Sequence, residues 1–196
     1  MFATIENAGR NLLRASALAT AIAVGGAAAA TVAVTPTAAV AQSITAANAR
    51  GDKALDADNY IEALHWYAIA ADQGDSRAEY NIGWIYDNGG HGVQQDYRLA
   101  REYYLKAAAQ GDSSAENNLG ELYYYGHGVT SDYATAAHWY KLAAAQGEEN
   151  AEFSLGWLYA NGQGVERDMA TARIWMQKSA EQGKQDAINW LAQHPG

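Results

Sequence analysis

The feature that most constrains this chain is a repeat with a period of 36 or 37 residues. Residues 78–93, 115–129 and 151–165 read AEYNIGWIYDNGGHGV, AENNLGELYYYGHGV and AEFSLGWLYANGQGV. A second shared segment alternates with the first and ends in glycine each time; its copies are 60–74, 97–111, 133–147 and 169–183. Because one short unit cannot bury its own apolar face, the units must stack. The sequence therefore predicts a solenoid.

Both segment types have the apolar spacing of α-helices. In the second copy of the first type, Ala115, Leu119, Leu122 and Tyr123 recur at helical intervals. Two kinds of signal mark the helix starts. The N-cap aspartates are Asp96, Asp132 and Asp168. The capping-box pairs are Ser76 with Glu79, Ser113 with Glu116 and Asn59 with Glu62. With an atypical helix at each end (43–59 and 184–193), we expect about nine helices.

Three glycines lie inside predicted helices, at the same position of successive repeats. They are Gly83, Gly120 and Gly156, and each should cost about 1 kcal/mol relative to alanine. A cost that recurs at one repeat position indicates a gain in packing. We predict that a neighbouring helix crosses there with no room for a Cβ atom.

These motifs resemble the Sel1-like repeat family, whose members are relatives of tetratricopeptide repeats. The resemblance covers residues 78–183, as in NLGELYYYGHGV followed by Asp132 and SLGWLYANGQGV followed by Asp168. It implies an all-α fold, a right-handed α/α solenoid, and a role in protein–protein interaction, often at bacterial envelopes. It divides the chain into a tetratricopeptide-like helical pair at 42–75, three Sel1-like repeats at 76–183 and a C-terminal capping helix at 184–196.

The first 41 residues have a different composition. Arg10 and Arg14 precede an apolar run that is followed by an A-x-A cleavage pattern at Ala39-Val40-Ala41. We expect a signal peptide cut between Ala41 and Gln42, which would place the protein in the periplasm or outside the cell. An uncleaved membrane anchor is the alternative.

The formal net charge of −9 argues against a nucleic-acid partner, which needs a basic surface.

The glycine-rich loop at 126–129 is predicted to be architectural. A phosphate-binding loop follows a strand, whereas a helix precedes this one. Gly126 would end that helix in a left-handed conformation, and Gly128 would allow a second bend. A histidine lies between the two glycines of the loop in two neighbouring repeats, namely His91 and His127. We expect these two side chains to lie too far apart to share a zinc ion. We expect no metal and no cofactor.

The candidate site lies where the repeats differ. In the family that the chain resembles, the first helices line the concave surface. The side of these helices away from the predicted core holds an aromatic strip with one acid near its centre: Tyr80, Trp84, Asn117, Glu121, Tyr124, Phe153 and Trp157. Aromatic anchors with a few polar groups are typical of surfaces that bind a peptide or protein.

The sequence contains no hydrolase, metalloprotease or nucleotide-binding motif, so we expect no catalytic residue. The prediction is a non-catalytic module that binds a partner protein or extended peptide in the groove. Some family members outside the cytoplasm regulate membrane sensor proteins in this way. The alternative is a glycan- or peptidoglycan-binding factor in which Trp84 and Trp157 stack on sugar rings. A hydrolase is the weakest interpretation.

Overall fold

The computed structural model describes residues 36–195. Within this range the chain forms nine α-helices and no strand. Their bounds are α2 (Pro36–Asp56), α3 (Tyr60–Ala71), α4 (Ser76–Asn88), α5 (Tyr97–Ala108), α6 (Ser113–Tyr125), α7 (Tyr133–Ala145), α8 (Glu149–Asn161), α9 (Met169–Glu181) and α10 (Gln185–Gln193). Most of the predicted leader lies outside the described residues, and the expected cut falls within α2. That cut stays a prediction.

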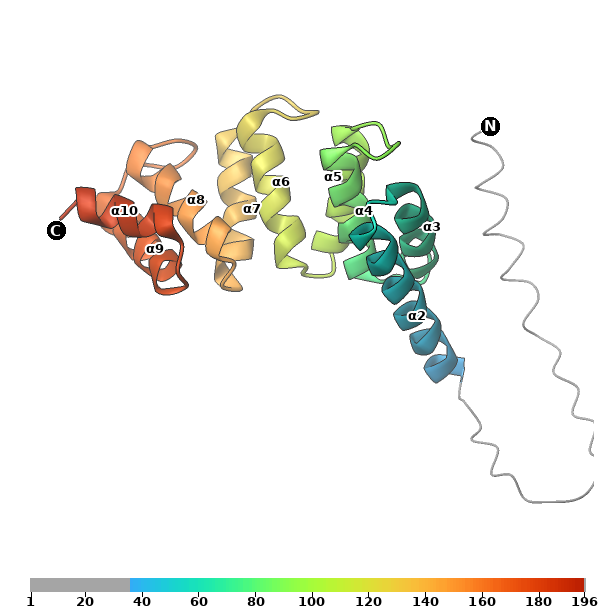
Figure 1. The fold of residues 1–196 in the computed structure, drawn as a ribbon. Helices are drawn as coiled ribbons and strands as arrows, with labels where there is room; N and C mark the ends of the chain where they lie inside the picture. Colours follow the sequence, from blue (N-terminus) through green and yellow to red (C-terminus); the bar gives the residue numbers. More distant parts are fainter. Residues whose placement is uncertain (1–35, 196) are drawn as a thin grey trace, which may run out of the picture. The chain divides into compact units, whose positions relative to one another are not determined.

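The chain divides into two units, Met1–Ser43 and Ile44–Gly196, and the repeats belong to the second. From α3 to α10 each helix contacts the next along the chain, and Figure 1 shows these helices following one another in sequence order. The apolar core is divided in the same way, into clusters from α2–α4, α5–α6, α7–α8 and α8–α10. A core made of successive local clusters is the property of a solenoid, and the predicted all-α solenoid is confirmed.

Glycines inside the first helices lie directly against the second helices. A Cβ atom on Gly120 would lie 2.5 Å from the Tyr140 ring, and one on Gly83 would lie 2.6 Å from the Tyr104 ring. Both distances are far below van der Waals contact, so the predicted close crossing is confirmed. Gly156 has more room, because its nearest neighbours are the Ala172 carbonyl and the flexible Met176 side chain, both at 3.1 Å.

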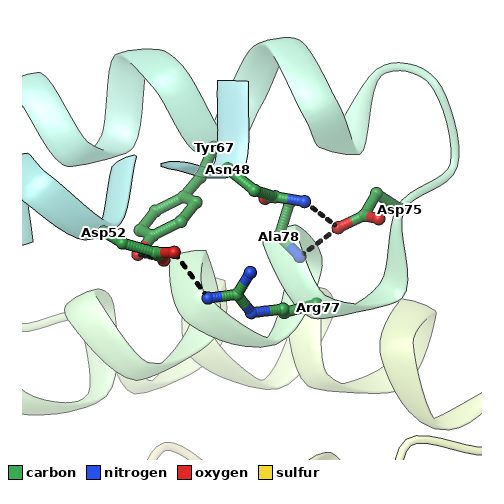
Figure 2. Close-up of polar contacts among 6 residues, drawn as sticks. All are labelled: Asn48, Asp52, Tyr67, Asp75, Arg77 and Ala78. Atoms are coloured by element: carbon green, nitrogen blue, oxygen red, sulfur yellow. Dashed lines mark hydrogen bonds and ion pairs between the residues drawn. The ribbon is translucent and has the colours of Figure 1, made fainter. Parts of the chain in front are cut away.

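The same contact identifies α2 as a first helix. A Cβ atom on Gly51 would lie 2.5 Å from the ring of Tyr67 on α3. Polar contacts hold α2 in this position, as Figure 2 shows: the Tyr67 hydroxyl donates to Asp52 at 2.8 Å, and Arg77 pairs with the same carboxylate at 2.7 Å. Asn48 donates to Asp75 at 2.9 Å. The segment that lacks the glycine-rich loop is therefore packed as a repeat like the others.

The helix starts agree only in part with the sequence signals. Asp96, Asp132 and Asp168 are N-caps whose carboxylates accept backbone N–H groups two and three residues further on. Asn59 caps α3 by accepting the Glu62 N–H at 3.3 Å, but the capping box is incomplete: the Asn59 side-chain amide donates to Glu62, and its backbone N–H donates to the Ala54 carbonyl instead. The capping boxes predicted for α4 and α6 are wrong, because the N-cap is one residue earlier in each case. Asp75 and Asp112 accept the N–H groups of Ala78 and Ala115, each at 2.9 Å.

The glutamates assigned to those capping boxes, Glu79 and Glu116, have another partner, and so does Glu152 at the same place in the following repeat. Glu79, Glu116 and Glu152 are buried, and each accepts a hydrogen bond from the glutamine that follows the second helix of its own repeat. The Nε2–Oε2 distances are 2.7 Å from Gln110, 2.7 Å from Gln146 and 2.9 Å from Gln182. Burial raises the pKa of Glu79 and Glu116. These bonds join the two ends of each of these three repeats.

The glycine-rich loops reach back to the preceding repeat. Gly126 ends α6 in the left-handed conformation, at φ 75° and ψ 30°, as predicted. A Cβ atom on Gly128, at φ 67°, would lie 2.7 Å from Cβ of Tyr97 at the start of α5. The His127 ring stacks on the Tyr97 ring with 4.6 Å between ring centroids, and the His91 ring lies 4.5 Å from the Tyr60 ring in a tilted arrangement. The loop is thus a contact between repeats.

Gly120→Ala is expected to destabilise the protein by about 1–3 kcal/mol, because the new methyl group overlaps the buried Tyr140 ring. Gly156→Ala is the matched control. There the flexible Met176 can move, the Ala172 carbonyl at 3.1 Å must shift by only a few tenths of an ångström, and alanine favours the helix by about 1 kcal/mol, so stability should change little. Denaturant unfolding of both variants measures the difference. Adding Tyr140→Met to Gly120→Ala should restore part of the loss, and equal stability of the two single variants would contradict the close crossing.

Candidate functional site

A hollow of about 310 Å³ opens on the surface formed by α6, α7 and α8. We call it the aromatic hollow, and it is lined by Tyr124, Tyr125, Tyr140, Phe153, Ser154 and Trp157. Three residues of the predicted strip, Tyr124, Phe153 and Trp157, therefore meet at one place. Trp157 keeps 40% of its surface exposed, although large aromatic rings are generally well buried. A hollow with an accessible indole is suited to hold an apolar or planar group.

The walls of the hollow are held by contacts among the rings. Phe153 and Trp157 lie one turn apart on α8, with 6.4 Å between their ring centroids. Tyr124 and Tyr125 form an edge-to-face pair at 4.9 Å, and the Tyr124 hydroxyl donates to Gln163 at 3.5 Å. Burial raises the pKa of Tyr124, so its hydroxyl stays a neutral hydrogen-bonding group at neutral pH. The hollow is thus formed before any ligand arrives.

The N-terminal part of the predicted strip is packed between helices. Trp84 is half-buried, and its ring lies 6.0 Å from the Tyr60 ring in the first core cluster. Tyr80 is half-buried 5.9 Å from Tyr104, where burial raises its pKa. Neither residue lines the aromatic hollow. The structure therefore does not bring the whole strip together.

Glu121 and Asn117 form the polar centre of the strip. Asn117 is only 5% exposed, and its amide nitrogen donates to the Glu121 carboxylate at 3.1 Å. The Asn117 Oδ1 atom is buried and accepts no hydrogen bond from the described residues. Leaving such an atom unpaired costs about 1–3 kcal/mol. Asn117 thus lies beneath the surface, with its amide nitrogen bonded to the Glu121 carboxylate.

Glu121 keeps exposed surface, but the surrounding helices remove enough water that burial raises its pKa. The charges of Asp87 and Glu148 act in the same direction. The hydrogen bond from Asn117 and the charge of Lys184 act in the opposite direction. The ionised carboxylate is therefore held at some cost in a field that is already negative.

Sequence reasoning left three residues of the hollow out of the strip. Tyr125 was recognisable, since it occupies the place of Asn88 and Asn161 on the same face. Tyr140 has the spacing of a core residue and is only 2% exposed, yet its side chain reaches the wall of the hollow. Ser154, which hydrogen-bonds to Tyr140, carries no signal of its own in the sequence.

Between residues 36 and 195, no group of three or more histidine, aspartate or glutamate side chains is arranged to hold a metal ion. In the same range, no helix combines the length and the apolar character needed to cross a bilayer.

The repeats match a known family model. The Sel1 repeat model matches four segments, residues 46–75, 76–112, 113–148 and 150–184. The chain belongs to the Sel1-repeat family. The first matched segment is the one built on Gly51 and Tyr67, so the family model and the packing agree that it is a repeat. Sel1-repeat proteins generally mediate protein–protein interaction, and the fold generally serves as a non-catalytic binding scaffold.

Solved structures of Sel1-repeat proteins resemble this one. One is c5321, a protective antigen present in uropathogenic Escherichia coli strains; it is 36% identical, with a TM-score of 0.66 over 78% of this chain and 35% of that one. A Sel1 repeat protein from Oxalobacter formigenes is 32% identical, with a TM-score of 0.68 over 80% of this chain and 47% of that one. This chain thus spans between a third and a half of each relative. The search of curated proteins gave no match.

Glu121→Gln is expected to make the protein more stable at pH 7. Because burial raises the pKa of Glu121 above its unfolded value, the folded state binds this proton more tightly than the unfolded state. The stability that the carboxyl contributes is therefore complete at low pH and is lost as the pH rises through the folded pKa. Glutamine resembles the protonated acid and should avoid that loss.

Melting temperatures of wild type and Glu121→Gln, measured from pH 4 to pH 8, check this expectation. The two curves should meet at low pH and separate near neutrality, with the variant higher. Glu102→Gln, at an exposed position of α5, is the control and should follow wild type throughout. A Glu121 variant that is less stable than wild type at pH 7 would contradict the assignment.

Proposed function

We propose that this Sel1-repeat protein is a non-catalytic module that binds a partner protein or an extended peptide segment through the aromatic hollow. The observation that carries the proposal is the meeting of Tyr124, Phe153 and Trp157 in one hollow, with Trp157 exposed. Exposed aromatic residues in a preformed pocket are the side chains that dominate binding energy at protein interfaces. The general role of the family supports the same class of function.

The proposed site of action is the bacterial envelope or the outside of the cell. The support is the N-terminal pattern of two arginines, an apolar run and the Ala39-Val40-Ala41 cleavage pattern. In that setting a membrane sensor protein is one candidate partner, which this module would regulate by binding it.

Glycan binding is the second candidate function, and the exposed indole of Trp157 is the observation that favours it. A sugar ring could stack on this face beside Phe153. Trp84 cannot contribute equally, since its ring is packed against Tyr60. A glycan site on this chain would therefore be a single platform at the hollow.

Pull-down from an envelope extract with the chain lacking residues 1–41 tests the proposal. Trp157→Ala should reduce recovery of a specific protein by about tenfold or more, the effect expected of an interface hot spot. Trp84→Phe keeps the packing against Tyr60 and is the matched control, so it should recover the same protein as wild type. Equal recovery by Trp157→Ala and wild type would exclude the hollow as the binding site.

The same variants separate the glycan alternative. Peptidoglycan fragments are added to wild type while tryptophan fluorescence is followed. Under the protein-binding proposal the emission stays unchanged. Saturable quenching that Trp157→Ala abolishes would instead establish the glycan function.

A further inference from the structure

We propose that the aromatic hollow and Glu121 together recognise a cationic side chain of the arginine or lysine type on the partner segment. The inference rests on the proposed function, because it names the chemistry of the group that the hollow takes. It requires an uncompensated carboxylate, a negative local field and aromatic faces within reach of one another. The described residues provide all three.

The carboxylate is positioned but is not paired with a cation. Within residues 36–195 Glu121 makes no ion pair, whereas Asp52, Asp58, Asp96 and Glu102 each do. The Asn117 amide nitrogen donates to the Glu121 carboxylate at 3.1 Å. Asn117 is buried, and the same place in the neighbouring repeats holds Tyr80 and Phe153. An asparagine with an unpaired oxygen is a poor substitute for an aromatic ring in packing. Its presence there is explained if the orientation of Glu121 matters.

The charges that act on Glu121 come from several elements and are mostly acidic. Asp87 near the end of α4 and Glu148 at the N-cap of α8 are close enough to raise its pKa. Both carboxylates are half-buried and accept internal hydrogen bonds, Asp87 from the Tyr104 hydroxyl at 3.1 Å and Glu148 from the Ala151 N–H at 2.6 Å, whereas Glu121 is exposed. The opposing cation, Lys184, donates to Asn150 at 2.6 Å. A cation from a partner would therefore meet a negative field in which Glu121 is the available acceptor.

Aromatic faces lie beside this carboxylate. Glu121 precedes Tyr124 and Tyr125 by three and four residues on α6, so the three side chains share one face of the helix. The charge of Glu121 also contributes to the raised pKa of Tyr140, which lines the hollow. A guanidinium or ammonium group can contact both a carboxylate and a ring face, and the ring contact gains strength where water is excluded. Neutral apolar groups would leave the carboxylate without a partner.

A pair of matched peptides tests this proposal. Acetyl-Ala-Arg-Ala-amide carries a guanidinium, and acetyl-Ala-citrulline-Ala-amide has nearly the same shape without the charge. Binding to the chain lacking residues 1–41 is followed by NMR shifts of the tryptophan indole N–H signals, with Trp157→Phe used to assign the Trp157 signal. The arginine peptide should bind about 5- to 30-fold more tightly than the citrulline peptide, as expected of a cation held by a ring and a carboxylate.

Three variants give the discriminating result. Glu121→Gln should remove the preference for arginine, and Asn117→Leu should weaken it while leaving the carboxylate in place. Glu102→Gln, which removes an exposed acid on α5, should leave it unchanged. Equal affinity for the two peptides, or a preference that survives Glu121→Gln, would overturn the cation proposal. Because the pull-down with Trp157→Ala reports separately on partner binding, that failure would leave the proposed function standing.

Discussion

The packing of this solenoid depends on one contact, the placement of an aromatic ring against a glycine in the facing helix. In three repeats a tyrosine of the second helix lies where a Cβ atom on the first helix would be. This sets how closely the two helices of a repeat approach, and it explains why glycine is kept inside a helix at a cost of about 1 kcal/mol. At Tyr104 and Tyr140 it also places the hydroxyl within reach of the next repeat, whereas the Tyr67 hydroxyl donates to Asp52 in its own repeat.

The tyrosine hydroxyl joins successive repeats through the residue that faces it on the next first helix. Tyr104 accepts a hydrogen bond from Asn118 of the next first helix at 3.0 Å, and the corresponding tyrosine, Tyr140, bonds to Ser154. In the last repeat the tyrosine is replaced by Met176, and the facing position is Trp190, which packs with it in the same apolar cluster. The polar pair is thus exchanged for an apolar pair as a unit where the stack ends.

Features that depend on one repeat alone could be predicted from the sequence. The helices, the glycine contact and the N-caps at Asp96, Asp132 and Asp168 all follow from local spacing. The capping boxes at Ser76 and Ser113 were wrong because an equally good cap, Asp75 or Asp112, stands one residue earlier. The strip was predicted only in part, since the packing of Trp84 depends on Tyr60 and that of Tyr80 on Tyr104, in neighbouring elements whose side-chain directions the periodicity does not specify.

The central repeat departs from its neighbours in a way that packing does not favour. Where the flanking repeats have an aromatic pair, Tyr80 with Trp84 and Phe153 with Trp157, it has Asn117 and Glu121. This exchange buries an unpaired amide oxygen and holds a carboxylate whose pKa burial raises. Both changes lower stability, and neither is needed for the glycine contact on which the stack depends. Residues that cost stability without supporting the fold are expected at binding sites. Glu121 precedes Tyr124 and Tyr125 of the aromatic hollow by one turn of α6, and this spacing argues that the polar centre and the rings form one functional surface.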